Sequence, residues 1–299
     1  MRRLISVRCR VKCVCESHKI RASIWPGTPG AVFFRHEIRH NDMPLGFRSR
    51  SAKPARKPSG YGVPAGQRIY AIGDIHGRDD LLRELLGRIE ADIRAAPGLT
   101  NTLVLLGDYV DRGFGASRVI DMLLDPPAWA SRFVPLKGNH EEMLLAFLAE
   151  PGFGADWRHF GGLETLASYG VGVRDVQLGR NYDKAAQDLA DSMPQAHIAL
   201  LQSLKLSCVI GDFFFCHAGV RPGLALDEQS PTDLMWIRDE FLLSERDHGR
   251  YVVHGHTPVE EPDVRVNRMN IDTGAYATGR LTCAVLESHD VRFLITGTG

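Results

Sequence analysis

Five short segments of this 299-residue chain combine acids, histidines, an asparagine and an arginine with glycines. Carboxylate oxygens beside imidazole nitrogens suit Mn, Fe or Zn better than Mg or Ca, and an arginine next to acids suits a site that also binds phosphate. Glycines let the backbone turn sharply and approach a ligand closely. The segments are Gly73-Asp74-Ile75-His76-Gly77, Gly107-Asp108-Tyr109-Val110-Asp111-Arg112-Gly113, Gly138-Asn139-His140-Glu141, His217-Ala218-Gly219 and His254-Gly255-His256-Thr257. Their residue types predict a site that handles both metal and phosphate.

Taken singly, each segment also fits a plain structural role. Asp74 could be a turn residue before a helix, Gly138-Asn139 a turn and a helix cap, and His217, which follows three phenylalanines, a core residue. Motif matches carry false positives. Three successive strand-to-helix junctions that carry metal-binding or proton-transferring side chains make these plain roles improbable.

The first three segments each follow an apolar run that predicts a strand, at 68–72, 103–106 and 133–136. Helical patterns come after them, at 81–89, at 116–124 and from Met143 to Leu148. In α/β proteins, ligands bind at the carboxyl ends of the strands. Asp74, His76, Asp108, Asn139 and His140 are therefore expected at one sheet edge.

The remaining apolar runs predict further strands and a helical insertion. Strands at 206–210 and 212–216 precede His217, and a strand at 251–253 precedes His254, with Arg238 on an intervening helical stretch. Short runs at 270–272, 281–286 and 291–295 are expected to form a second sheet facing the first. Residues 151–204 predict a helical cap that has no chemistry of its own but shapes the substrate groove.

Charge divides the chain into two parts. Residues 1–68 carry 15 Lys/Arg and 3 Asp/Glu, a net +12, which leaves 21 Lys/Arg and 33 Asp/Glu, a net −12, for residues 69–299. The net negative charge of residues 69–299 suits cation binding and argues against general binding to nucleic acids. Residues 1–66 are expected to be a basic, disordered arm, with a Pro/Gly/Ser-rich linker at 44–66, and Met43 is a candidate true start.

The number of cysteines and the hydropathy of the chain indicate its cellular compartment. Six cysteines are too few for a disulfide scaffold in a chain of this length. Cys208, Cys216 and Cys283 are expected to be buried thiols, whereas Cys9, Cys13 and Cys15 form only a weak zinc candidate. The chain has no apolar run long enough to span a membrane. A cytoplasmic protein without membrane or nucleic-acid partners is predicted.

With all five segments in view, residues of about 68–296 resemble the phosphoprotein phosphatase family of bimetallic metallophosphoesterases, and in particular its compact bacterial serine/threonine phosphatases. The resemblance rests on the order and spacing of the five segments. It implies an α/β fold, the calcineurin-like metallophosphoesterase four-layer sandwich, with two mixed β-sheets flanked by helices and with a helical insertion. On this basis a catalytic domain over 67–299 is expected.

The resemblance also implies a role for each site residue. Arg112 and Arg238 would bind the substrate phosphate, and His140 would be the general acid, oriented by Asp111. His254 occupies a position where many members of that family have a different residue, and it is expected to support the site from behind. The implied metal ligands are Asp74 and His76 for the first ion, Asp108 as a bridge between two ions, and Asn139, His217 and His256 for the second. The implied cofactors are two divalent metal ions, with Mn the expected pair in vitro and Fe/Zn an alternative.

Three functions follow as hypotheses. The first is a monomeric serine/threonine protein phosphatase, with phosphotyrosine as a further candidate substrate. It would act on a phosphorylated protein by direct attack of a metal-bridging hydroxide without a phosphoenzyme. The second is a hydrolase of dinucleoside polyphosphates or another small phosphoester, which the presence of Asp111 disfavours. The third is a non-catalytic metal-binding regulator, which the intact His140, Asp111 and Arg112 argue against.

Overall fold

The computed structural model describes residues 21–24, 32–35 and 60–297. By its internal contacts the chain divides into Met1–Asp42 and Met43–Gly299. Within the first unit, strands β1 (Arg21–Ile24) and β2 (Val32–Arg35) pair antiparallel, which the sequence pattern of the arm did not indicate. The three cysteines of the zinc candidate and most of the predicted linker lie outside the described residues.

The first sheet of the second unit has the strand order β12-β11-β3-β4-β5. Strands β3, β4 and β5 run parallel, and β11 lies antiparallel to both β3 and β12. The sheet is therefore mixed, as expected. Its strands are β3 (Gln67–Ile72), β4 (Thr100–Leu105), β5 (Arg132–Pro135), β11 (Thr282–Glu287) and β12 (Asp290–Ile295).

The second sheet has the order β6-β7-β8-β10-β9 and is also mixed. Strands β7, β8 and β10 run parallel, with β6 and β9 antiparallel at the two edges. The prediction that all strands after residue 264 belong to the second sheet was wrong, because β11 pairs with β3 and carries β12 into the first sheet. The strands are β6 (Ser207–Ile210), β7 (Phe213–Cys216), β8 (Tyr251–His254), β9 (Asp263–Val264) and β10 (Arg268–Asn270).

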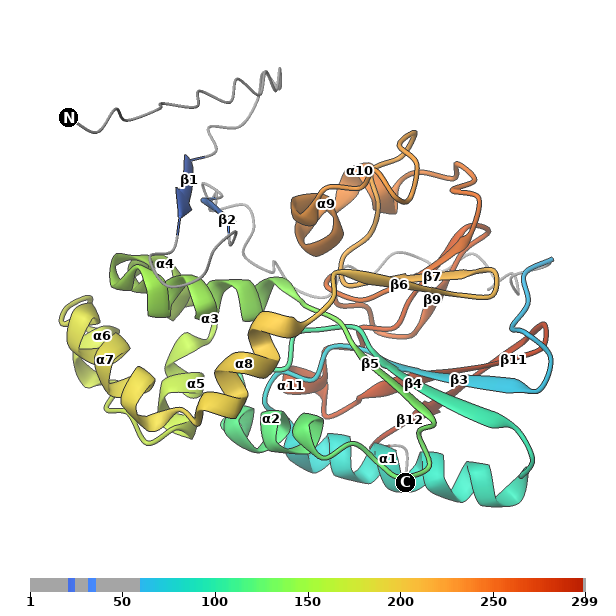
Figure 1. The fold of residues 1–299 in the computed structure, drawn as a ribbon, viewed down its shortest axis with the longest axis horizontal. Coiled ribbons are helices and arrows are strands. Elements are labelled where there is room, and N and C mark those ends of the chain that lie inside the picture. The colour runs from blue at the N-terminus through green and yellow to red at the C-terminus, as the bar shows by residue number, and fades with distance from the viewer. Residues whose placement is uncertain (1–20, 25–31, 36–59, 298–299) are drawn as a thin grey trace, which may run out of the picture. The chain divides into compact units, whose positions relative to one another are not determined.

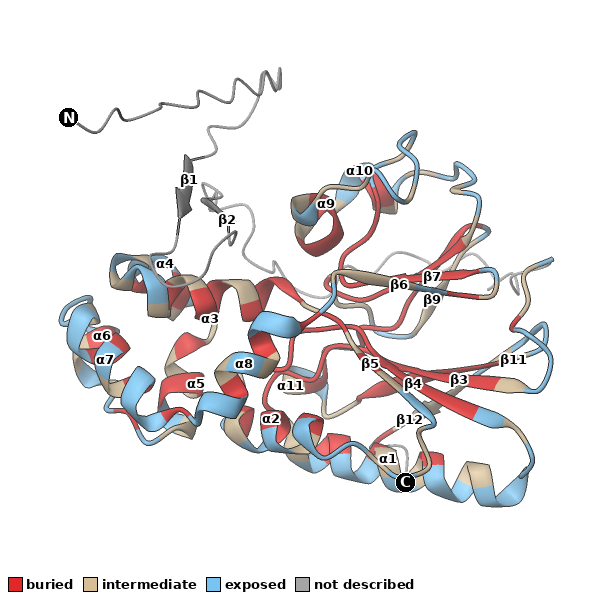
Figure 2. Cartoon of the chain, in the orientation of Figure 1, coloured by how far each residue is buried: buried red, intermediate tan, exposed pale blue. Residues whose placement is uncertain are grey.

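The two sheets face each other across the main hydrophobic core. Strand β7 shows how the layers are built, because Phe213 and Phe215 point into the core between the sheets while Phe214 and Cys216 point outward. Leu234 and Phe241 cover that outer side. Side chains alternate between the faces of a strand, so a strand that is apolar throughout must be covered on both sides. Figure 2 shows β3, β4 and β7 largely buried and the edge strand β6 less so.

Helices complete the sandwich on its two outer faces (Figure 1). Helices α1 (Asp79–Ala95) and α2 (Ala116–Leu124) lie on the outer face of the first sheet, with Leu81, Leu85 and Ile89 buried at helical spacing. Helices α9 (Pro231–Trp236) and α10 (Asp239–Leu242) cover the second sheet. The layers run helix, sheet, sheet, helix, so the predicted four-layer sandwich is confirmed.

The predicted helical insertion is confirmed between β5 and β6. It follows α3 (Asn139–Ala149), whose first helical residue is Asn139. The insertion consists of η2 (Pro151–Phe153), α4 (Gly154–Trp157), η3 (Arg158–Phe160), α5 (Gly162–Ser168), α6 (Arg174–Gln177), α7 (Tyr182–Ser192) and α8 (Gln195–Ser203). A last short helix, α11 (Ala275–Thr278), lies between β10 and β11.

The packed domain begins before the expected boundary at residue 67. Val63 is buried in the core between the sheets, and its N–H donates to the Ser288 carbonyl at 2.8 Å. Tyr61 packs its ring against Tyr251 with centroids 5.2 Å apart. These apolar residues attach the end of the predicted linker to the core. Among the described residues, no helix is both long and apolar enough to cross a membrane.

The thiol predictions can be checked for the described cysteines. Cys216 and Cys283 are buried and free, as expected, whereas Cys208 is free but only half-buried. Cys208 lies on the edge strand β6, where one flank of the sheet has no further strand to cover it.

Candidate metal centre

The polar segments lie at the carboxyl ends of strands from both sheets. Asp74 and His76 follow β3, Asp108 follows β4, Asn139 opens the helix after β5, and His217 follows β7. His256 comes two residues after the end of β8. The expected sheet edge is confirmed, and the second sheet contributes to the same place because its parallel strands point to the same end of the sandwich (Figure 1).

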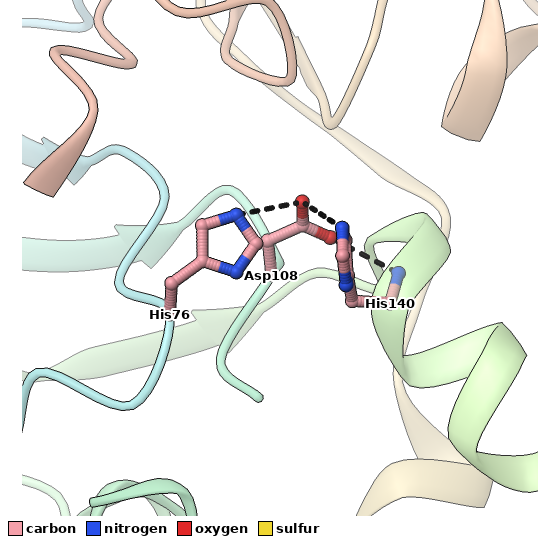
Figure 3. A group of neighbouring side chains, drawn as sticks. All are labelled: His76, Asp108 and His140. Atoms are coloured by element: carbon pink, nitrogen blue, oxygen red, sulfur yellow. Dashed lines mark hydrogen bonds and ion pairs between the residues drawn. The ribbon is translucent and has the colours of Figure 1, made fainter. Parts of the chain in front are cut away.

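Asp108 lies at the centre of this group. Its Oδ2 is 3.5 Å from His76 Nε2 and 3.8 Å from His140 Nε2, and its Oδ1 is 3.4 Å from His217 Nε2. Figure 3 shows the rings of His76 and His140 on the two sides of the carboxylate. All four side chains are buried. A buried carboxylate with imidazole nitrogens on both sides is suited to bridge two cations.

The remaining predicted ligands surround His217. Its Nε2 is 2.9 Å from Asn139 Oδ1 and 3.2 Å from His256 Nδ1. Asp74 lies beside the same turn, since its Oδ2 accepts a hydrogen bond of 3.0 Å from the His256 backbone N–H. All six predicted ligands are thus brought together, and two sets of three ligand atoms, from His76/Asp108/His140 and from Asp108/His217/His256, each fall within 4.8 Å of one another.

The donor set fits divalent cations. His217 Nδ1 contacts the Leu106 carbonyl at 2.9 Å and His76 Nδ1 contacts the Val110 carbonyl at 2.9 Å. A carbonyl only accepts, so each Nδ1 carries a proton, and each ring, when it is neutral, presents an Nε2 lone pair. Those lone pairs face oxygen atoms of Asp108 and Asn139 that are also acceptors. Converging lone pairs in a buried place require cations or extra protons between them.

Ionisation in the site agrees with this reading. Burial disfavours a charged Asp108, but the neighbouring His217 and His140 outweigh it and hold the pKa of its carboxyl well below the usual range. Burial, then the charges of Asp272 and Asp108, raise the pKa of Asp74 well above its usual value. Burial lowers the pKa of His76, which favours the neutral, metal-binding ring. Two close carboxylates interact this way when no cation is bound.

Several site residues adopt backbone conformations that side chains rarely take. His76, Asp108 and His256 have φ angles of 46°, 54° and 69°. Each such residue costs on the order of 1–3 kcal/mol. A β-carbon added at Gly255 would lie 2.1 Å from Asp74 Oδ1, so glycine is required there. Such strain concentrates at functional sites, where the surrounding structure must hold it.

Glu141 holds the strained segment after β4, a role that the sequence reading missed. Its Oε2 accepts from the backbone N–H of Gly138 at 2.8 Å and of Asp108 at 2.9 Å, and its Oε1 accepts from Tyr109 at 2.7 Å and Val110 at 3.3 Å. By sequence alone, its place in the first turn of a helix indicates only that its charge suits the helix dipole. The Gly-Asn-His-Glu order could have indicated more, because a side chain in the first turn can reach back to the preceding loop.

The predicted acid and its partner form a tight pair. His140 Nδ1 lies 2.6 Å from Asp111 Oδ2, and both side chains are buried. Arg112 Nη2 is 3.3 Å from His140 Nε2, so the guanidinium and the imidazole face the same point beside Asp108. This arrangement combines a phosphate-binding cation, an oriented imidazole and a metal-type cluster, which together can hydrolyse a phosphoester.

Comparison with known proteins agrees with this geometry. Residues 67–297 match the model of the calcineurin-like phosphoesterase family. The chain belongs to this family. Its members use divalent metals, so the protein is a metallophosphoesterase, a metal-binding hydrolase.

Two relatives of this phosphoesterase have different named activities. The serine/threonine-protein phosphatase 2 of Escherichia coli is 28% identical over 223 residues, which cover 72% of this chain and 90% of that protein. The asymmetrical bis(5'-nucleosyl)-tetraphosphatase of Anoxybacillus flavithermus is 28% identical over 233 residues, covering 71% and 87%. The structure of a cold-active protein tyrosine phosphatase shares the fold, with a TM-score of 0.52, 19% identity and coverage of 76% and 75%.

Arg238 lies near the site but not on a helix. It occupies the break between α9 and α10, with φ −129° and ψ −105°, and its Nη1 donates to Thr257 Oγ1 at 3.3 Å. The sequence pattern placed it on a helical stretch, which was wrong, because the backbone breaks after Trp236. Its charge also lowers the pKa of His256, after the larger effect of burial.

His254 is buried behind the metal-type cluster, as expected for a supporting residue. Its Nε2 lies 3.3 Å from Nη1 of the buried Arg268, and its Nδ1 lies 3.1 Å from the Gly255 carbonyl. An arginine donates only, so the ring is neutral and Nε2 accepts. Burial, then the charge of Arg268, lowers the pKa of His254 well below the usual range.

The helical insertion, which is predicted to have no chemistry of its own, contacts the site through several side chains. Trp157 and Thr165 of the insertion donate hydrogen bonds to the two carboxylate oxygens of Asp111, at 2.9 and 2.6 Å. Phe160 lies edge-on to His140 with centroids 6.3 Å apart. Nothing in the amphipathic pattern of this segment separates these contacts from ordinary core packing.

Proposed function

We propose that this metallophosphoesterase is a phosphomonoesterase that removes phosphate from phosphoserine and phosphothreonine in proteins. The observation that carries the proposal is the His140–Asp111 pair at 2.6 Å with Arg112 beside it. A serine or threonine alkoxide is a poor leaving group and needs a proton as the bond to phosphorus breaks. An imidazole whose other nitrogen is held by a carboxylate is equipped to supply it.

The roles of the predicted site residues follow from their placement. Two divalent ions, when bound by Asp74, His76, Asp108, Asn139, His217 and His256, would stabilise charge at phosphorus and acidify water. Arg112 binds the phosphoryl oxygens with its planar guanidinium, and the ring of Tyr276 supports that group, 4.6 Å from the Arg112 Cζ atom. Arg238 provides a second cation at the side of Thr257.

The proton balance of the reaction is simple. The oxygen of a water molecule forms the new bond to phosphorus, and the bond from phosphorus to the seryl or threonyl oxygen breaks. In the structure Nε2 of His140 faces Nη2 of Arg112, a donor, so Nε2 takes up its proton when the guanidinium binds the phosphoryl oxygens instead. The leaving oxygen then takes that proton, while Asp111 retains the hydrogen bond to Nδ1. The products are orthophosphate and an alcohol, and His140 regains its proton from solvent. No side chain forms a covalent intermediate.

Hydrolysis of dinucleoside polyphosphates is the second candidate, because a relative of equal identity carries that name. Its leaving group is a nucleotide phosphate, which departs without a strong need for general acid catalysis. The oriented His140–Asp111 pair is therefore of more use to the first candidate. A cytoplasmic location, a monomeric state and the choice of Mn or Fe/Zn stay predictions.

The deciding experiment measures phosphate release by the full-length protein, stripped of metal and reloaded with Mn. A phosphoserine/phosphothreonine peptide and a dinucleoside tetraphosphate are compared at equal concentration, with Asp108→Asn as the inactive control. A higher kcat/KM on the peptide, dependent on Mn, supports the proposal. A higher kcat/KM on the dinucleotide overturns it in favour of the second candidate, and no hydrolysis of either with metal bound favours a non-catalytic regulator.

A further inference from the structure

Both carboxylate oxygens and the backbone N–H of Asp111 are hydrogen-bonded, and two of the three side chains that bond to them belong to the helical insertion. Oδ2 accepts from Trp157 Nε1 at 2.9 Å and contacts His140 Nδ1 at 2.6 Å. Oδ1 accepts from the Thr165 hydroxyl at 2.6 Å, and the Asp111 N–H donates back to the same hydroxyl oxygen at 2.8 Å. With both oxygens bonded in fixed directions, the carboxylate cannot rotate without breaking a buried hydrogen bond.

The two partners in the insertion are themselves rigidly held. Trp157 and Thr165 are fully buried. The Trp157 indole packs on Phe147 of α3 with ring centroids 4.7 Å apart. A β-carbon added at Gly162 would lie 2.4 Å from Trp157 Cδ2, so the glycine leaves the indole only its own space. The direction of the indole N–H is therefore set by packing.

The insertion also holds the backbone of this loop. Asp111 and Arg112 have φ angles of 69° and 67°, a conformation that costs a non-glycine residue free energy. Besides the bond from Asp111 to Thr165, the Arg112 N–H donates to the Gly161 carbonyl at 3.1 Å. The contacts that orient the carboxylate thus also keep the segment with Arg112 in its strained form.

We propose that Trp157 and Thr165 are positioning residues, through which the helical insertion fixes the Asp111 carboxylate and so aims the His140 ring at the leaving oxygen. The inference rests on the proposed function, because it assigns His140 the proton transfer. Both residues are fully buried and act through Asp111. Their hydrogen bonds set the one direction in which Asp111 Oδ2 can hold His140 Nδ1, and therefore the direction of Nε2.

The test uses variants that keep shape and remove one donor. Trp157→Phe retains an aromatic ring without the N–H, and Thr165→Val is nearly isosteric without the hydroxyl, with Thr165→Ser as the matched control that keeps it. Steady-state rates are measured on phenyl phosphate, a poor leaving group, and on p-nitrophenyl phosphate, a good one. Metal content and Tm are recorded for each variant.

General acid catalysis contributes roughly 10²–10⁴-fold, so a misaimed acid should lose a sizeable part of it. We expect Trp157→Phe and Thr165→Val to lower kcat on phenyl phosphate about tenfold or more, with p-nitrophenyl phosphate within about twofold. Thr165→Ser should restore the wild-type ratio. An equal loss on both substrates at full metal content overturns the proposal, because a merely structural effect does not depend on the leaving group.

A double-mutant cycle separates this proposal from the function on which it rests. In a His140→Asn background, Trp157→Phe should cost nothing further on phenyl phosphate, and an undiminished loss overturns the positioning role. Should His140→Asn itself affect both substrates equally, the proposed acid role fails instead.

A measurement without turnover keeps the proposal testable if a variant is inactive. The proton between His140 Nδ1 and Asp111 is expected to give a low-field proton NMR resonance, assigned by its loss in His140→Asn. Trp157→Phe should shift or broaden that resonance while the rest of the spectrum keeps its dispersion. An unmoved resonance in both Trp157→Phe and Thr165→Val overturns the positioning role whatever the enzyme hydrolyses.

Discussion

Replacing Glu141 with glutamine should destabilise the fold strongly, although the two side chains have the same shape. Each carboxylate oxygen accepts two backbone N–H bonds, from Gly138 and Asp108 on one side and from Tyr109 and Val110 on the other. An amide supplies only one oxygen. In either orientation its NH₂ group would face two buried N–H donors.

The magnitude follows from those lost bonds. A buried donor left without an acceptor costs about 1–3 kcal/mol, so two cost about 2–6 kcal/mol. Part of this is offset because the carboxylate is itself penalised, since burial and the charge of Asp108 raise the pKa of Glu141 to about 7. We therefore expect Glu141→Gln to lower the free energy of unfolding by about 1–4 kcal/mol.

The neighbouring Glu142 provides a matched control. Its Oε2 accepts from Trp236 Nε1 at 2.9 Å, and a glutamine can present its carbonyl oxygen to that indole. Glu142→Gln should cost less than about 1 kcal/mol. Urea unfolding at pH 7 with chelator present measures both without a metal contribution. A loss below about 1 kcal/mol for Glu141→Gln would refute the assigned role of the carboxylate in holding the loop.

Three further outcomes are expected. Asp108→Asn should abolish turnover and reduce the bound metal below two ions per chain, because the amide offers a single uncharged oxygen where the carboxylate offers two charged ones. Two bound ions with near-normal rates would contradict a bridging role. Chelation of the wild-type protein should lower Tm, because bound cations stabilise the charged form of Asp74, which burial and the neighbouring carboxylates disfavour. An unchanged Tm would show that the site holds no metal in the folded protein. Deleting residues 1–42 should leave kcat and Tm unchanged, because the family match begins at residue 67; a large drop in either would assign the arm to the fold.

Local sequence patterns predicted the strands whose carboxyl ends carry the candidate metal ligands. The expected strand at 68–72 and helix at 116–124 agree with β3 and α2 within a residue, because apolar runs and helical spacing are local properties. The pairing of β11 with β3 was not predictable in this way. Those strands are far apart in the chain, and the continuous apolar run of β11 fits either sheet equally well.

The site residues also differ in whether a local sequence pattern or a long-range contact reveals them. Asp74, His76, Asp108 and their partners are recognisable because polar side chains stand next to glycines at strand ends. Trp157 and Thr165 are not, since an indole in an amphipathic segment reads as core until the carboxylate that its N–H meets is known. Glu141 lies between, because its position in a first helical turn was visible but its four backbone partners were not.

The bond from the His256 backbone to Asp74 has a consequence for synthesis and refolding. It joins residues 182 apart in the chain. Contacts of such long separation form late and slow folding, so the early strands must wait until most of the polypeptide has emerged before the cation cluster can close. Metal uptake would then report the docking of the two sheets. A truncated chain ending before β8 would hold β3, β4 and β5 but lack His256, and would acquire neither full metal content nor the stability that comes with it.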